Sequence, residues 1–256
     1  MVGPAGNDSE RPRLGWTLGP VAHRGLHNAA RGRIENTASA IEAALAKGYA
    51  IEVDLQADRD GVPVVFHDER LERLIDADGE VADRSLAELQ ALSYRGSRDR
   101  ILSLDELLEM VQGRVPLVIE VKTMFGEPGA YEQTIARKLA GYRGPLAVMS
   151  FDHRSVASFR TLAPLIPRGM ISYRWDDGWM PHVPEAERQA LRDLDWQDRV
   201  MPSFIAYDID DLPEAAPLEL CRRLGIPLFT WTVSTPAQRA LAAQLADAII
   251  FEGFEP

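Results

Sequence analysis

Residues 50–68 read AIEVDLQADRDGVPVVFHD, and the topology predicted for the whole chain depends on how this segment turns. It contains two apolar runs, residues 50–55 and 62–66, with only residues 56–61 between them. A parallel crossover needs a dozen residues or more, whereas Asp60-Gly61 is a typical hairpin signal. We therefore expect residues 62–66 to form an antiparallel excursion that rises from the strand 50–55 and folds back.

On both sides of this segment, short apolar runs alternate with helical patterns, which indicates βαβ units and a parallel sheet. The expected strands are residues 20–23, 50–55, 62–66, 117–121, 146–150, 169–172, 203–206, 228–231 and 248–251. The clearest helices are residues 38–47, 85–92, 104–111, 130–139, 153–162, 218–224 and 236–245. Without the excursion eight strands remain, so the predicted fold is a TIM-like (β/α)8 barrel with an extra β-hairpin excursion after strand 2. An open doubly wound sheet is the alternative.

The length of 256 residues suits one barrel domain, which typically takes about 250 residues, although two smaller domains would also fit. Residues 1–15 are rich in Pro, Gly and charge, so we expect a flexible arm followed by a single domain at 16–256. The long connection 173–200 contains Trp175, Trp179 and Trp196. It is either a lid or substrate wall on the C-terminal face, or a surface helix with buried tryptophans.

The charge and the cysteine content limit the ligands and the kinds of site that the protein can have. A formal net charge of -11 argues against nucleic acid, and a cation is needed if so acidic a protein is to hold an anionic substrate. Cys221 is the only cysteine, which excludes disulfides and zinc-thiolate sites. The sequence shows neither a signal peptide at its start nor a run of roughly 18 apolar residues, so we expect a cytoplasmic protein without stable membrane insertion. It leaves the oligomeric state open.

Charged residues fall at the ends of two expected strands, where a barrel carries its chemistry. Glu52 and Asp54 are two residues apart and point to the same side, as do Glu120 and Lys122. Burying such charges is costly unless they are paired or bind an ion. Oxygen ligands favour Mg²⁺ or Ca²⁺, so the three carboxylates predict a metal site, with buried ion pairs as the structural alternative.

Two histidines at expected strand ends, His23 and His67, could supply acid–base catalysis because imidazole titrates near neutral pH. Arg24 offers a planar fork for phosphate oxygens. Glu35 precedes the first helix and could reach the barrel mouth as a further acid. The remaining histidines do not fall at strand ends, and we expect them away from the active face; they are His27, His153 and His182.

Taken in order, these residues resemble the glycerophosphodiester phosphodiesterase family. The matching motifs are HRG at 23–25, ENT at 35–37, EVD at 52–54, DGVPVVFHD at 60–68, LSLDELL at 102–108, EVK at 120–122, SFD at 150–152 and WTV at 231–233. Each motif alone is weak, whereas the ordered set is specific and spans nearly the whole chain after residue 18. The resemblance implies the barrel fold and the hydrolysis of a small glycerophosphodiester to glycerol 3-phosphate and an alcohol such as choline or ethanolamine.

The resemblance also implies a role for each site residue. A divalent cation would be held by Glu52, Asp54 and Glu120, with His23 and His67 as the acid–base pair. Substrate and phosphate contacts would come from Arg24, Lys122, Phe151 and Trp231, with Glu35 in a supporting role.

The last strand departs from the family, which usually has Gly-Ile-Ile-Thr-Asp there. Phe251 replaces a polar residue, and Glu252 is the residue that could take the place of the aspartate. This departure concerns the alcohol side of the substrate. The alternatives are therefore a related barrel phosphodiesterase of the phospholipase D type that acts on lysophospholipids, for which Trp175, Trp179 and Met180 could form an apolar rim, and a catalytically silent binding barrel.

Overall fold

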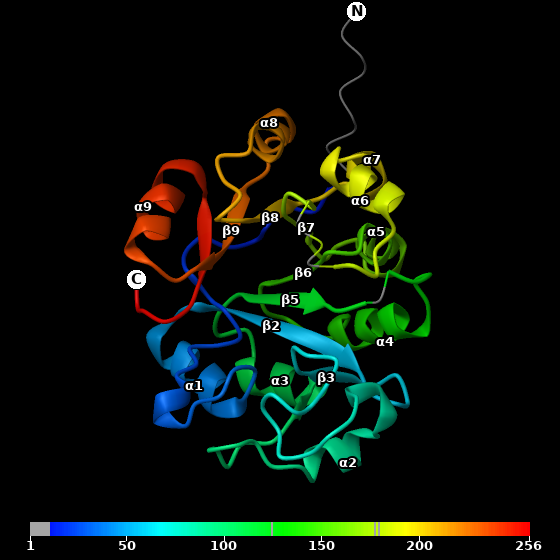
Figure 1. Ribbon diagram of the computed structural model, residues 1–256, viewed down its shortest axis with the longest axis vertical. Coiled ribbons are helices and arrows are strands. Elements are labelled where there is room, and N and C mark those ends of the chain that lie inside the picture. Colours follow the sequence, from blue (N-terminus) through cyan, green and yellow to red (C-terminus); the bar gives the residue numbers. More distant parts are fainter. Residues whose placement is uncertain (1–10, 124, 177, 179) are drawn as a thin grey trace, which may run out of the picture.

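The computed structural model describes residues 11–123, 125–176, 178 and 180–256. Its parallel strands close into a barrel (Figure 1), which confirms the predicted fold. In order around the barrel they are β1 (Val21–Ala22), β2 (Ala50–Ala57), β5 (Leu117–Val121), β6 (Leu146–Ser150), β7 (Arg168–Ser172), β8 (Phe204–Asp208), β9 (Leu228–Val233) and β10 (Ala248–Phe251). Closure comes from β1, which pairs in parallel with both β10 and β2.

The expected excursion is present as β3 (Pro63–Val65), which pairs antiparallel with the end of β2. The Asp58 side chain holds the turn by accepting hydrogen bonds from the backbone N–H groups of Asp60 (2.8 Å) and Val62 (2.7 Å). A further strand, β4 (Leu102–Ser103), pairs antiparallel with β3 and was not expected. A strand of two residues has no alternation pattern that a sequence could reveal.

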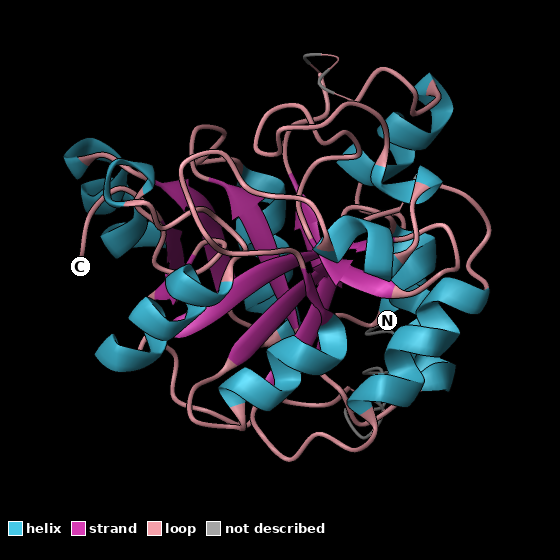
Figure 2. Cartoon of the chain, turned by 90° about the horizontal axis from the view of Figure 1, so that it is seen from below, coloured by secondary structure: helices cyan, strands magenta, loops and turns pink. Residues whose placement is uncertain are grey.

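The helices surround the strands (Figure 2). They are α1 (Ala38–Lys47), α2 (Leu86–Gln90), α3 (Leu104–Val111), α4 (Ala130–Leu139), α5 (His153–Leu162), α6 (Glu185–Arg192), α7 (Gln197–Val200), α8 (Ala215–Leu224) and α9 (Pro236–Leu245), with the 3-10 turns η2 (Ala29–Arg31) and η3 (Val81–Asp83). Capping boxes define the starts of α2, α3 and α9, because Ser85, Ser103 and Thr235 each exchange hydrogen bonds with the residue three positions later.

In its described part, the connection after β7 contains α6, α7 and two buried tryptophans, as one of its two interpretations predicted, while Met180 and His182 of the same connection line the cavity at the barrel mouth. Trp175 and Trp196 are each 1% exposed. The indole N–H of Trp175 donates to Ser172 Oγ at 2.9 Å, which fixes the first ring against the end of β7. Trp179 lies outside the described residues.

Apolar side chains form two clusters among the described residues. The larger one fills the barrel and the space between strands and helices. The smaller one lies beneath the excursion and includes Val64, Phe66, Leu71, Ile75 and Tyr94. The segment 57–103 thus has its own small core, which allows it to hold polar residues over the barrel mouth.

The predicted arm, residues 1–15, falls mostly outside the described residues. In its described part, the Pro12 carbonyl accepts a hydrogen bond from Ser203 Oγ at 2.5 Å. Arg11 Nη1 donates to the Leu224 carbonyl at 3.3 Å, and Leu14 packs against the main cluster. Residues 11–14 therefore lie against the start of β8 and the end of α8.

We expect Gly169→Ala to destabilise the barrel by about 1–3 kcal/mol, because overpacking a tight core forces strain. A Cβ at this position in β7 would lie 2.3 Å from the ring of Phe204, which is fully buried and stacks against Phe229. Urea unfolding of both proteins measures the difference. Gly19→Ala is the matched control, since a Cβ there meets nothing within 4 Å. Equal stability of Gly169→Ala and the parent protein would contradict the tight packing.

Candidate active site

The carboxyl ends of the barrel strands open into one cavity of ≈ 1120 Å³. Most of the residues that the sequence singled out line it: His23, Arg24, Glu52, His67, Glu120, Lys122, Phe151 and Trp231. Asp54 and Glu35 stand behind this lining and contact Lys122 and Arg24, respectively. The structure thus brings all ten candidate residues to one place.

Three carboxylates meet at the floor of this cavity, two of them in its lining and Asp54 directly behind it. Glu52, Asp54 and Glu120 are buried, and they can offer ligand oxygens that all lie within 4.8 Å of one another. The register of the sheet causes this, because Asp54 of β2 pairs directly with Glu120 of β5. Lys122 Nζ lies 2.7 Å from Glu120 and 3.0 Å from Asp54, and Arg24 Nε lies 3.4 Å from Asp54.

The electrostatics of the floor reflect this crowding. Burial and the neighbouring charges of Asp54 and Glu120 raise the pKa of Glu52 well above its usual value. Burial acts on Asp54 in the same direction, but the positive charges around it, that of Lys122 above all, together outweigh burial and hold the pKa of Asp54 well below its usual range. When all three are ionised, as a bound cation would favour, the carboxylates outnumber the two cationic side chains that face them, and oxygen-only ligands suit Mg²⁺ or Ca²⁺. The residues therefore fit a divalent cation.

Each of the two histidines is held at Nδ1 by a carboxylate. His23 Nδ1 lies 2.7 Å from Glu252 Oε2, and His67 Nδ1 lies 2.6 Å from Asp68 Oδ1. The Nε2 atom of each ring is thus left for chemistry, and that of His23 lies 4.0 Å from Glu52. Burial lowers the pKa of His23, which favours its neutral form.

The turn after β1 brings backbone as well as side chains to the site. The N–H of Arg24 donates to Glu52 Oε2 at 2.9 Å. Gly25 follows with φ +78°, and a Cβ there would lie 2.9 Å from the carbonyl carbon of Ala40. Only glycine fits both demands, so this position lets the turn pass directly over α1.

Asn36 stands just before α1, where an asparagine usually caps a helix, but here it has another role. Thr37 occupies the N-cap position, and its side chain accepts no capping hydrogen bond from the helix. The Asn36 side chain instead donates to Asp54 Oδ2 at 2.8 Å and so orients one of the three carboxylates. Such a support of a ligand carboxylate is typical of metal sites.

A chain of charges joins the two sides of the cavity. Arg73, from the connection after β3, donates to Glu35 through both terminal nitrogens at 2.7 and 2.8 Å. Its Nε also donates to Asp68 at 2.5 Å. Glu35 in turn accepts from Arg24 at 2.6 Å, so Arg24 and His67 are the two ends of one network.

Aromatic side chains form another part of the cavity wall. The rings of Phe151 and Trp231 meet edge to face with centroids 5.5 Å apart. Phe125 stands edge to face with Trp175 at 6.1 Å and with His182 at 6.0 Å. The cavity therefore has a charged side and an aromatic side.

Two of the histidines that the sequence analysis set aside lie at this face, so that expectation is wrong for them. His182 lines the cavity, and His27 Nε2 lies 3.4 Å from Glu252. His153, by contrast, contacts Glu187 of α6 outside the barrel. Strand-end position could not find these residues, because they reach the site from loops.

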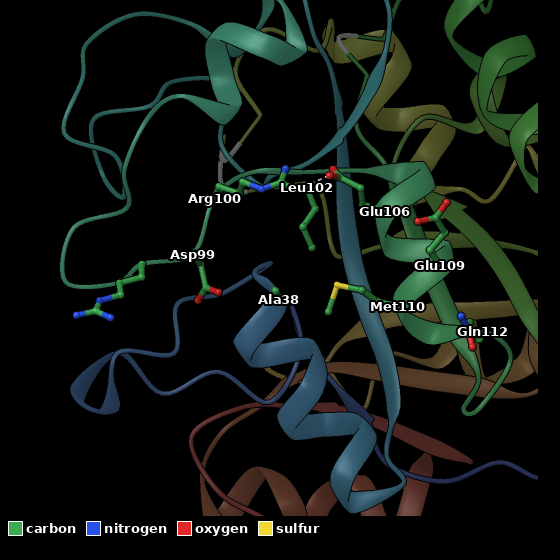
Figure 3. Close-up of a pocket in the computed structure, with 9 residues that line it drawn as sticks. Ala38, Asp99, Arg100, Leu102, Glu106, Glu109, Met110 and Gln112 are labelled. Carbon is green, nitrogen blue, oxygen red and sulfur yellow. Dashed lines mark hydrogen bonds and ion pairs between the residues drawn. The ribbon is translucent and has the colours of Figure 1, made fainter.

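A second, more open hollow of ≈ 700 Å³ lies on the outer surface beside α1 and α3 (Figure 3). Its charges are largely satisfied locally, since Arg100 pairs with Glu106 at 2.6 Å and Asp99 accepts from Ser39. It contains none of the candidate residues. The cavity at the barrel mouth is therefore the candidate active site.

The chain is similar in sequence to known proteins over most of its length. The sequence model of the Glycerophosphoryl diester phosphodiesterase family matches residues 23–253. The chain is 30% identical over 223 residues to the glycerophosphodiester phosphodiesterase of Caldanaerobacter subterraneus subsp. tengcongensis, covering 83% of this chain and 84% of that protein. It is 34% identical over 240 residues to YhdW of Bacillus subtilis, covering 90% and 92% of the two chains.

Solved structures share the fold. An Oleispira antarctica phosphodiesterase in complex with the product sn-glycerol-3-phosphate has a TM-score of 0.73 at 22% identity, covering 91% of this chain and 93% of that one. The glycerophosphodiester phosphodiesterase of Thermotoga maritima has a TM-score of 0.70 at 22% identity, with 92% and 94% covered. The family match over nearly the whole described barrel, with curated relatives that are covered over most of their length, shows that this chain belongs to the glycerophosphoryl diester phosphodiesterase family.

Proposed function

We propose that this protein hydrolyses glycerophosphodiesters to glycerol 3-phosphate and an alcohol. One observation carries the proposal: three buried carboxylates and two carboxylate-anchored histidines share one cavity. The names of the relatives support it, and so does the glycerol 3-phosphate bound to the Oleispira antarctica protein.

The floor carboxylates Glu52, Asp54 and Glu120 would hold a divalent cation, Mg²⁺ or Ca²⁺. That ion would supply positive charge where negative charge develops on the phosphate during the reaction. Arg24 and Lys122 border the same floor, and their fixed positions suit them to bind phosphate oxygens.

The histidines divide the proton transfers. The neutral form that burial favours in His23 suits it to take the proton from the nucleophile, which is water or the glycerol hydroxyl. His67 is then left to protonate the departing alkoxide. Glu252 and Asp68 fix the ring orientations that both transfers require.

The remaining candidate residues would orient the substrate. Phe151 and Trp231 offer ring faces and edges in the cavity wall, against which the alcohol portion would lie. Glu35 stays in a supporting role, because it holds Arg24 and Arg73 and does not line the cavity.

A second candidate substrate is a lysophospholipid. The aromatic side of the cavity includes Phe125 and Met180, and such apolar surface could receive an acyl chain. Among the described residues, no helix combines the length and apolar character that a membrane crossing requires. Comparing the kcat/KM of the purified protein for glycerophosphocholine and for lysophosphatidylcholine below its micelle concentration decides between the two.

The first experiment is to incubate metal-stripped protein with glycerophosphocholine and glycerophosphoethanolamine, adding Mg²⁺ or Ca²⁺ in turn. We expect glycerol 3-phosphate release only when a cation is present, measured with a coupled dehydrogenase assay. Release of a phosphomonoester of the alcohol instead would place the cut on the other ester bond. Absence of both products for either substrate and either ion would contradict the proposed activity.

Replacing either histidine should lower kcat by roughly 10²–10⁴-fold while the circular dichroism spectrum stays unchanged. The two variants should differ when the alcohol is replaced by p-nitrophenol, a leaving group that needs no proton. His67→Ala should then recover most of its activity, whereas His23→Ala should not. Recovery by His23→Ala alone would reverse the two roles, and near-normal turnover of either variant on glycerophosphocholine would remove that histidine from the mechanism.

Glu52→Gln should separate metal binding from folding. It removes one of three crowded carboxylates, so the metal-free variant should be at least as stable as the metal-free parent protein. The parent should gain about 2.7 kcal/mol from Mg²⁺ or Ca²⁺ at a hundredfold excess over Kd, or several degrees in Tm. The variant should gain little, as thermal unfolding with and without the ion will measure. An equal gain in both proteins would place the ion elsewhere.

A further inference from the structure

A second group of possible metal ligands lies beside the carboxylate floor. It consists of His23, His27 and Glu252, whose ligand atoms lie within 4.8 Å of one another. Unlike the floor, this cluster offers two imidazole nitrogens and one carboxylate oxygen. The side chains are between 15% and 35% exposed, so an ion could reach them from solvent.

The fold holds these three residues in place before any ion arrives. β1 and β10 pair in parallel, with Ala22 opposite Phe251. His23 and Glu252 are the residues that directly follow these two strands. The N–H of His23 donates to the Phe251 carbonyl at 3.0 Å, and that of Glu252 to the Val233 carbonyl at 3.1 Å.

Backbone hydrogen bonds of the residues before and after His27 hold it in the β1–α1 loop. The preceding residue, Leu26, donates its N–H to the Ala40 carbonyl at 2.9 Å. The following residue, Asn28, donates to the Arg33 carbonyl at 2.8 Å. The backbone that carries the imidazole is therefore preorganised, which reduces the entropy cost of binding a ligand.

The distances suit a tetrahedral ion with small adjustments. Zinc bonds of about 2.0–2.1 Å at tetrahedral angles separate neighbouring ligand atoms by roughly 3.4 Å. His27 Nε2 and Glu252 Oε2 are 3.4 Å apart. His23 Nδ1 and Glu252 Oε2 are 2.7 Å apart, so this pair would open by roughly 0.7 Å as its hydrogen bond gives way to two metal bonds.

The chemistry of His27 points the same way. Its Nε2 atom is buried and has no hydrogen-bond partner among the described residues, although it faces the Glu252 carboxylate. A buried polar atom in that state has a free-energy cost that a bound cation would relieve. Imidazole nitrogens favour Zn²⁺ and similar ions, whereas the oxygen-only floor favours Mg²⁺ or Ca²⁺.

We propose that His23, His27 and Glu252 form a second cation site, which binds Zn²⁺ or an ion of similar softness beside the Mg²⁺ or Ca²⁺ site. On binding, the proton of His23 Nδ1 is transferred through solvent to Nε2, so that a neutral imidazole binds the ion, and water fills the fourth position of the ion. The site does not depend on the proposed activity. If the activity is as proposed, Zn²⁺ engages the ring of His23 and should inhibit turnover without displacing Mg²⁺.

The test is calorimetric titration of the full-length, metal-stripped protein with Zn²⁺ in the presence of excess Mg²⁺, which keeps the carboxylate floor filled. We expect one zinc site in the parent protein. His27→Asn and Glu252→Gln should each weaken it by at least about tenfold. His182→Asn is the matched control: it removes a cavity histidine outside the cluster and should leave zinc affinity unchanged.

Zinc X-ray absorption adds a readout that does not depend on activity. We expect two imidazole ligands in the parent protein and one in His27→Asn. Absence of zinc binding in the parent, a spectrum with oxygen ligands only, or equal zinc affinity of the parent and His27→Asn would each overturn the proposal. In that case the cluster is a hydrogen-bonded support for His23. Failure of the diesterase assay would leave the binding and absorption results unaffected.

Discussion

Crowding of like charges in the barrel mouth is the constraint from which the rest of the site follows. Glu52, Asp54 and Glu120 are carried by adjacent parallel strands whose register makes them neighbours, and a barrel interior gives them little water. Buried charge in this arrangement costs several kcal/mol unless it is compensated. Lys122 and Arg24 provide part of that compensation, and the backbone N–H of Arg24 provides another part. The polar residues of the mouth are thus one interdependent set.

The excursion after β2 supports part of this set of polar residues. Residues 57–103 build a separate apolar cluster, and on it stand His67, Asp68 and Arg73. A short loop after β2 would have no apolar core of its own to fix the positions of these side chains. A segment with its own core can instead fix an imidazole over the carboxylates and connect it, through Arg73 and Glu35, to the turn after β1.

The sequence predicted the barrel and its ten candidate site residues because both leave local signals. Buried parallel strands appear as short apolar runs, and the charged residues at their ends break those runs at a fixed point, as Glu52 and Glu120 do. What it did not predict depends on contacts between distant segments. Asn36 resembles a helix cap until Asp54 is seen beside it. His27, Arg73 and Glu252 acquire their partners only through the closure of the barrel and the folding back of the excursion. The two-residue strand β4 and the short helix α7 are too short to show a period.

The seam at which the barrel closes passes directly through the site. β1 is among the first segments of the barrel to be synthesised and β10 is the last, yet His23 is oriented by Glu252 across their junction. A nascent chain whose β10 is still inside the ribosome already contains Glu52, Asp54 and Glu120, but its His23 has no Glu252 to orient the ring. Under the proposed mechanism, the competence of His23 for proton transfer therefore arrives only with the last strand of the barrel, and partly made chains would not turn over the substrate.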